Sequence, residues 1–91
     1  MNYSIEIDTK TEKTVIKWKK SNPILFRKLR DILEDMMSHP RTGIGHPEPL
    51  IGGENAIYSR RISAHDRIIY KIYDDRLTIL VISVSGHYSD K

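Results

Sequence analysis

The stretch DRIIYKIYDDRLTILVISV, from Asp66 to Val84, decides the fold class of this chain. Two runs rich in Ile, Val, Leu and Tyr flank the acidic pair Asp74-Asp75, and such runs are typical of β-strands. Asp74-Asp75 is expected to form a two-residue turn, because aspartate tolerates the positive φ angles that tight hairpins require. The stretch therefore predicts an antiparallel hairpin with strands Arg67–Tyr73 and Arg76–Val84.

A third strand is predicted upstream, over Ile57–Ile62, with a looser turn at Ser63–Asp66. Before it stands RTGIGHPEPLIGG, from Arg41 to Gly53, with four glycines and two prolines. This composition predicts either a loop or an interrupted edge strand.

Two helices are predicted ahead of these strands. Asn22 can cap the longer one, and Pro23 suits its first position because the missing N–H needs no partner there. His39-Pro40 ends it. Its apolar side chains recur at helical spacing: Ile24, Leu25, Leu29, Ile32, Leu33, Met36 and Met37.

The N-terminal segment begins with alternation at Tyr3–Ile7, which predicts a short strand. Asp8 and Thr9 can then cap a shorter helix that runs to about Lys20, with Val15 and Trp18 on its buried side. The chain of 91 residues is thus expected to be one α+β domain over 1–91.

The composition excludes several protein classes. Without cysteine there is no disulfide framework and no cysteine-bound metal, and the four histidines do not fall at metal-ligand spacing, so no metal is expected. No segment has the length and apolarity of a signal peptide or a membrane span, so a soluble, cytoplasmic protein is expected.

The hairpin turn also predicts which residues lie opposite each other. Across the hairpin the expected pairs are Tyr73–Arg76, Ile69–Leu80 and Arg67–Ile82. With the upstream strand they are Ile62–Arg67, Arg60–Ile69 and Tyr58–Lys71. Directly opposite side chains share a face of the sheet.

Two faces follow from this pairing. An apolar face, which should take the helices, carries Ile57, Ile68, Tyr70, Ile72, Leu77, Ile79 and Val81. The opposite face carries Tyr58, Arg60, Arg67, Lys71 and Tyr73, with Ile69, Leu80 and Ile82 among them. A basic face with aromatic rings is either an ordinary solvated sheet face or an RNA-binding surface, and the net charge of +3 leaves both open.

Four blocks of the sequence are similar in order and spacing to one known family. They are GIGHPEPL (Gly43–Leu50), YSRRI (Tyr58–Ile62), DRIIYKI (Asp66–Ile72) and GHY (Gly86–Tyr88). Together they resemble the YoeB-like family of the RelE toxin superfamily, where the blocks read G-x-G-K-P-E-P-L, W-S-R-R-I, H-R-L-V-Y and a terminal H-Y. Departures from the pattern are His46 and Ile51 in place of lysine and Tyr58 in place of tryptophan.

This resemblance implies two N-terminal helices on one face of a twisted, mainly antiparallel sheet, with the active site on the open face. It implies an enzyme that cuts messenger RNA in the ribosomal A site without a metal or other cofactor. The implied partners are a YefM-like antitoxin, the ribosome with its mRNA, operator DNA only through the antitoxin, and a second copy in a homodimer. The alternative is a non-catalytic module that binds its antitoxin and regulates its operon.

The catalytic residues implied by the resemblance are Glu48, Arg67, His87 and Tyr88. Cleavage by the 2′-hydroxyl of RNA needs a base, an acid and a cation, and Glu48, His87 and Arg67 are candidates for these roles. Tyr88 can stack on a base or position the phosphate. Strict alternation places His87 on the helix face, so Gly86 is expected to break the pattern.

Five further residues are expected to bind RNA, namely His46, Tyr58, Arg60, Arg61 and Lys71. Arg60 and Arg61 point to opposite faces because they are neighbours on one strand. The predicted register favours Arg60 as an RNA contact, while Arg61 either contacts RNA as well or closes an internal salt bridge.

Overall fold

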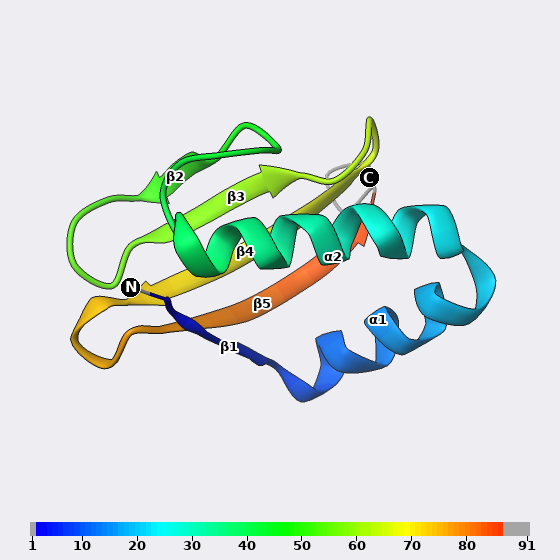
Figure 1. The fold of residues 1–91 in the computed structure, drawn as a ribbon, viewed down its shortest axis with the longest axis horizontal. Helices are drawn as coiled ribbons and strands as arrows, with labels where there is room; N and C mark the ends of the chain where they lie inside the picture. The colour runs from blue at the N-terminus through cyan, green and yellow to red at the C-terminus, as the bar shows by residue number, and fades with distance from the viewer. Residues whose placement is uncertain (1, 87–91) are drawn as a thin grey trace.

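The computed structural model describes residues 2–86, which form two helices and a five-stranded sheet (Figure 1). The helices are α1 (Thr9–Ser21) and α2 (Pro23–Ser38), and a short 3₁₀ turn, η1, covers Asp74–Arg76. The strands are β1 (Ser4–Ile7), β2 (Glu48–Ile51), β3 (Ile57–Arg61), β4 (Asp66–Tyr73) and β5 (Thr78–Gly86).

The strands lie in the order β1-β5-β4-β3-β2. β1 runs parallel to β5, while the other neighbours are antiparallel. Both helices cover the same face of the sheet and leave the other face open (Figure 1). The expected α+β architecture is confirmed, and of the two alternatives for Arg41–Gly53, the interrupted edge strand is the one observed, as β2.

Local signals position the helices as predicted. The Asp8 carboxylate accepts a hydrogen bond from the Lys10 N–H at 3.2 Å, and the Asn22 side chain accepts one from the Leu25 N–H at 3.3 Å. Pro23 occupies the first turn of α2, and His39 caps its end. Each helix therefore begins where a side chain can satisfy an otherwise free backbone donor.

The core lies between α2 and the two longest strands. The buried side chains of this cluster are Leu29, Ile32, Met36, Ile62, Ile68, Tyr70, Ile72, Ile79, Val81 and Val84. Val15 and Trp18 of α1 pack against its margin, as predicted.

The predicted turn of the β4–β5 hairpin is wrong. Tyr73 pairs with Thr78 and Lys71 with Leu80, so the connection spans Asp74 to Leu77 rather than two residues. Leu77 was expected on the apolar face, but it lies in the turn, partly exposed, with a φ of 47°. A three-residue 3₁₀ turn followed by a left-handed residue closes this hairpin, a known alternative to the two-residue turn.

A register shift also displaces the far end of the hairpin. Tyr70 pairs with Val81 but Ile69 pairs with Ser83, so Ile82 is an extra residue in β5. Arg67 consequently lies opposite Ser85 and not opposite Ile82. A bulge changes which face the following residues occupy, so the alternation of β5 already breaks at Ile82. The break expected at Gly86 concerns His87, which lies outside the described residues.

The predicted pairing of β3 with β4 is wrong by one residue. Arg61 pairs with Arg67, Arg60 with Ile68 and Tyr58 with Tyr70. A shift of one residue moves every side chain of a strand to the other face. Ile57, expected on the apolar face, accordingly lies opposite Lys71 on the open face.

Candidate functional site

Two arginines lie directly opposite each other on the open face. Arg61 on β3 pairs with Arg67 on β4, and their Cβ atoms are therefore expected about 4.5–5.5 Å apart. Arg61 is exposed and Arg67 is half-buried. Like charges directly opposite each other destabilise a strand pair, and two guanidinium groups so placed could together bind an anion.

Ser59 connects this pair to Glu48. The Arg67 guanidinium donates a hydrogen bond from Nη1 to the buried Ser59 hydroxyl oxygen at 3.2 Å. Glu48, the first residue of β2, pairs with Ser59 and is exposed. Because Arg61 follows Ser59 by two residues on the same strand, a carboxylate and two guanidinium groups share one area of the open face.

The turn before β2 fixes the position of Glu48, the first residue of that strand. The Arg61 N–H donates to the Gly45 carbonyl oxygen at 2.6 Å, which attaches the turn to β3. Gly45 has a φ of 83°, and a Cβ there would lie 2.8 Å from the Arg61 carbonyl oxygen. His46 follows with a φ of 53° and an exposed side chain. His46 thus directly follows the residue whose carbonyl is bonded to the Arg61 backbone.

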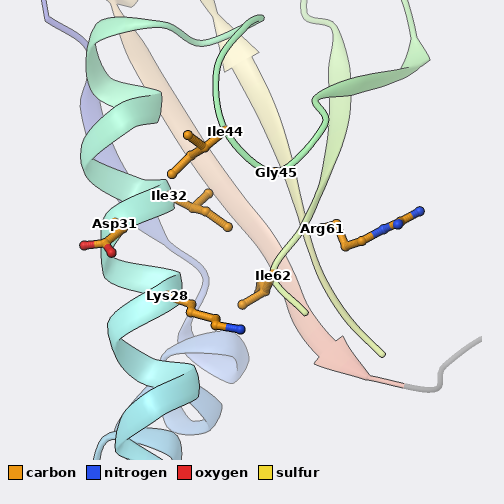
Figure 2. A pocket seen from close by; sticks show the side chains of 7 residues that line it. All are labelled: Lys28, Asp31, Ile32, Ile44, Gly45, Arg61 and Ile62. Carbon is orange, nitrogen blue, oxygen red and sulfur yellow. The ribbon is translucent and has the colours of Figure 1, made fainter. Parts of the chain in front are cut away.

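The apolar side of this turn packs against α2. Ile44 and Gly45 line a groove of about 260 Å³ together with Ile32 and Ile62, while Lys28, Asp31 and Arg61 complete the lining. Figure 2 shows the Arg61 side chain directed away from the isoleucines. The groove and the charged site therefore lie on different sides of β3.

The expected placement of Arg60 is wrong. Its side chain is fully buried on the helix face and forms an ion pair with Asp35 at 2.7 Å. Burial alone would raise the pKa of Asp35, but hydrogen bonds from Arg60 and from the Ile44 N–H outweigh it and hold that pKa below its ordinary value. The internal salt bridge thus belongs to Arg60, and Arg61 is the arginine that faces outward.

Tyr58 is also misplaced by the predicted register. Its ring stacks on Tyr70 with centroids 6.1 Å apart, on the helix side of the sheet. Burial raises the pKa of the Tyr70 hydroxyl, although the nearby Arg60 opposes this effect. Lys71 does lie on the open face as expected, with its ammonium 5.2 Å from the Tyr73 ring centroid. The aromatic member of the basic face is therefore Tyr73 and not Tyr58.

His87 and Tyr88 lie outside the described residues. Gly86, the last one described, pairs with Asp66, next to the pair formed by Arg67 and Ser85. The last described residue of β5 therefore lies at the same end of the sheet as Arg67.

Within residues 2–86, no group of three His, Asp or Glu side chains is arranged to hold a metal ion. None of the helices there is long and apolar enough to span a membrane.

Comparison with known proteins identifies the family. The family model described as the YoeB-like toxin of bacterial type II toxin–antitoxin systems matches residues 8–88. Toxin YoeB of Streptomyces coelicolor is 34% identical over 73 residues, which cover 80% of this chain and 84% of that protein.

Two solved structures from Staphylococcus aureus share the fold. A YoeB dimer superposes with a TM-score of 0.81 at 25% identity, covering 97% of this chain and 100% of the other. A YoeB–YefM complex gives a TM-score of 0.79 at 25% identity with the same coverage. The resemblance seen in the sequence motifs is thereby confirmed: this chain belongs to the YoeB-like family of bacterial type II toxin–antitoxin toxins.

Proposed function

We propose that this toxin is a ribosome-dependent endoribonuclease that cuts messenger RNA in the ribosomal A site by acid–base catalysis without a metal. The observation that carries the proposal is the paired Arg61 and Arg67 beside the exposed Glu48. Cations next to a carboxylate are what a phosphodiester needs when its own 2′-hydroxyl is the nucleophile.

The proposed reaction assigns one task to each group. Glu48 takes the proton of the 2′-hydroxyl while its oxygen attacks the adjacent phosphorus. Arg61 and Arg67 stabilise the negative charge that develops on the phosphorane oxygens, because guanidinium stays charged and can contact two oxygens at once. The bond from phosphorus to the 5′-oxygen breaks, leaving a 2′,3′-cyclic phosphate.

The leaving 5′-oxygen needs a proton from an acid. His87 is the proposed donor, since an imidazole can hold a proton near neutral pH and release it. Tyr88 is proposed to stack on a base or to position the phosphate. Both proposals rest on the motif alone.

Binding of RNA is proposed for the open face. Lys71 and Tyr73 extend the charged area along β4 and can contact phosphate and base, respectively. His46 is proposed as a further contact from the turn before β2. We propose an antitoxin of the YefM type as the neutralising partner, acidic where it covers Arg61, Arg67 and Lys71, with operator DNA bound only through it. The YoeB dimer supports a homodimer for this chain.

The test of the proposed function is the position of RNA cuts. A reconstituted translation system with a defined mRNA should yield cleavage at the A-site codon, and only when ribosomes are present. Glu48→Ala and His87→Ala should abolish cleavage and also the toxicity of the induced protein in cells. Cleavage that needs no ribosome and stops on addition of a chelator would contradict the proposal.

One alternative is a non-catalytic relative that binds its antitoxin and regulates its operon. It predicts antitoxin binding without any cut in the mRNA, so the same assay separates the two.

A further inference from the structure

The buried Arg60 plays no part in the proposed reaction, yet every N–H of its guanidinium is used. Nε donates to the Tyr70 hydroxyl at 2.9 Å, and Nη1 donates to Asp35 at 2.7 Å and to the Ile44 carbonyl at 3.2 Å. Nη2 donates to the carbonyl oxygens of His39 and Thr42. An arginine has five such donors, so none is left over.

The three backbone acceptors belong to one segment of the chain. His39, Thr42 and Ile44 lie in the irregular stretch that links α2 to β2, and the Tyr70 hydroxyl donates in turn to the Pro40 carbonyl at 2.8 Å. This stretch has no regular structure to pair its own carbonyl groups, and buried carbonyl groups need partners. Arg60 therefore supplies the hydrogen bonds that define the path of the turn.

Asp35 holds the same turn from the helix side. Its Oδ2 accepts from the Ile44 N–H at 3.2 Å as well as from Arg60. Gly43 has a φ of 114°, and a Cβ there would lie only 1.9 Å from that oxygen. The backbone thus passes so close to the Asp35–Arg60 pair that only glycine fits.

The turn continues directly into the candidate site. The backbone groups of Ile44 are held by Arg60 and Asp35. His46 follows Ile44 by two positions in the sequence, and Glu48 follows it by four. Gly45 is bonded to the backbone of Arg61, the neighbour of Arg60. One pair of adjacent arginines therefore places a guanidinium on each side of β3, one to hold the turn and one to face the substrate.

We propose that Arg60 is a positioning residue for catalysis: through its bonds to the His39–Ile44 turn it sets where Glu48 stands relative to Arg61 and Arg67. This inference rests on the proposed function. A merely structural Arg60 would affect stability and, with it, the amount of folded protein, but not the rate constant of the folded fraction. A positioning Arg60 affects that rate constant at unchanged substrate binding.

The test compares Arg60→Lys with a core variant of equal stability. Lysine keeps the positive charge beside Asp35 but has only three donors and no planar fork, so several turn carbonyls lose their partner. Ile79 is fully buried in β5, which lies between β1 and β4 and away from β3, so it provides the control. Ile79→Val or Ile79→Ala is chosen, whichever unfolds at the same urea concentration as Arg60→Lys.

The measurements are single-turnover cleavage of ribosome-bound mRNA at saturating enzyme, and the enzyme concentration that gives half the maximal rate. Arg60→Lys should lower the maximal rate at least tenfold relative to the Ile79 variant, with the half-saturating concentration unchanged within about twofold. Equal maximal rates for the two variants would overturn the inference.

A second variant and a second readout keep the outcomes distinct. If Arg60→Lys does not fold, Asp35→Asn perturbs the same turn more gently and should lower the maximal rate in the same way. Amide hydrogen exchange at Ile44 and Arg61 should speed up in these variants relative to the Ile79 control, even if the wild-type protein cuts no RNA. Absence of wild-type cleavage refutes the proposed function, whereas unchanged exchange refutes the role of Arg60.

Discussion

Replacing Arg61 with alanine should inactivate the protein without unfolding it. The side chain is exposed on the open face, and within residues 2–86 it makes no hydrogen bond or ion pair, while the backbone bond from its N–H to Gly45 is one that alanine preserves. Exposed substitutions of this kind usually change stability by no more than about 0.5 kcal/mol. Removal of the like charge opposite Arg67 offsets part of any loss, because like charges across a strand pair repel.

Arg61→Ala should affect the cleavage rate far more than it affects the stability. Loss of one group that stabilises the transition-state charge typically lowers the rate by about 10²–10³, or roughly 2.7–4 kcal/mol of barrier. The adjacent Arg60→Ala should lower the stability as well as the cleavage rate, since it leaves Asp35 and three backbone carbonyls without their partner. Breaking a buried ion pair costs about 3–5 kcal/mol, out of about 5–15 kcal/mol for a whole domain.

Urea unfolding followed by circular dichroism, together with single-turnover cleavage in a reconstituted translation system, measures both quantities. Arg61→Lys serves as the matched control and should recover part of the rate, because it keeps the charge but loses the bidentate geometry. The reasoning is refuted if Arg61→Ala cuts at the wild-type rate, or if it loses more than about 1 kcal/mol of stability.

Three other changes test the pH dependence, the hairpin and the RNA contact. Hydrogen bonds from Arg41 and Tyr3 lower the pKa of Asp74 from 3.8 to about 2, so its stabilisation is present above about pH 4 and is lost as the pH falls toward 2. Asp74→Asn should therefore lower the Tm at pH 7 but hardly at pH 2, and equal losses at both would contradict this. Leu77→Asn should raise the urea midpoint by an amount equivalent to about 0.5–1 kcal/mol, because Leu77 is left-handed with a φ of 47° and asparagine tolerates that conformation better; a lower midpoint would contradict it. His46→Lys should flatten the pH dependence of RNA binding and strengthen binding near pH 8, measured on a His87→Gln background, because lysine keeps its charge where an imidazole loses it; an unaltered pH profile would show that His46 is only a turn residue.

Much of this protein follows from the sequence because the relevant signals are local. Asn22-Pro23 starts α2 and His39-Pro40 lies at its end, since capping and proline sterics act within a few residues. The apolar runs predict strands, and the prolines on either side of Glu48 restrict any strand there to an edge, where a missing N–H is tolerated.

The motifs also indicated the family, because several short blocks at fixed spacing are together specific for it. None of these signals fixes which strand residues face each other across the sheet.

Only the tertiary structure decided which of two adjacent arginines is buried. Alternation tells that Arg60 and Arg61 point to opposite faces, but not which face each one takes, because that depends on a register of one residue. The register is set by contacts between segments far apart in the sequence. For β3, Asp35 and the His39–Ile44 turn surround the Arg60 guanidinium with acceptors. For β5, the extra residue at Ile82 shifts the end of the strand against β4. A buried guanidinium is tolerable only where all its donors find partners, and those partners come together only when the chain has folded.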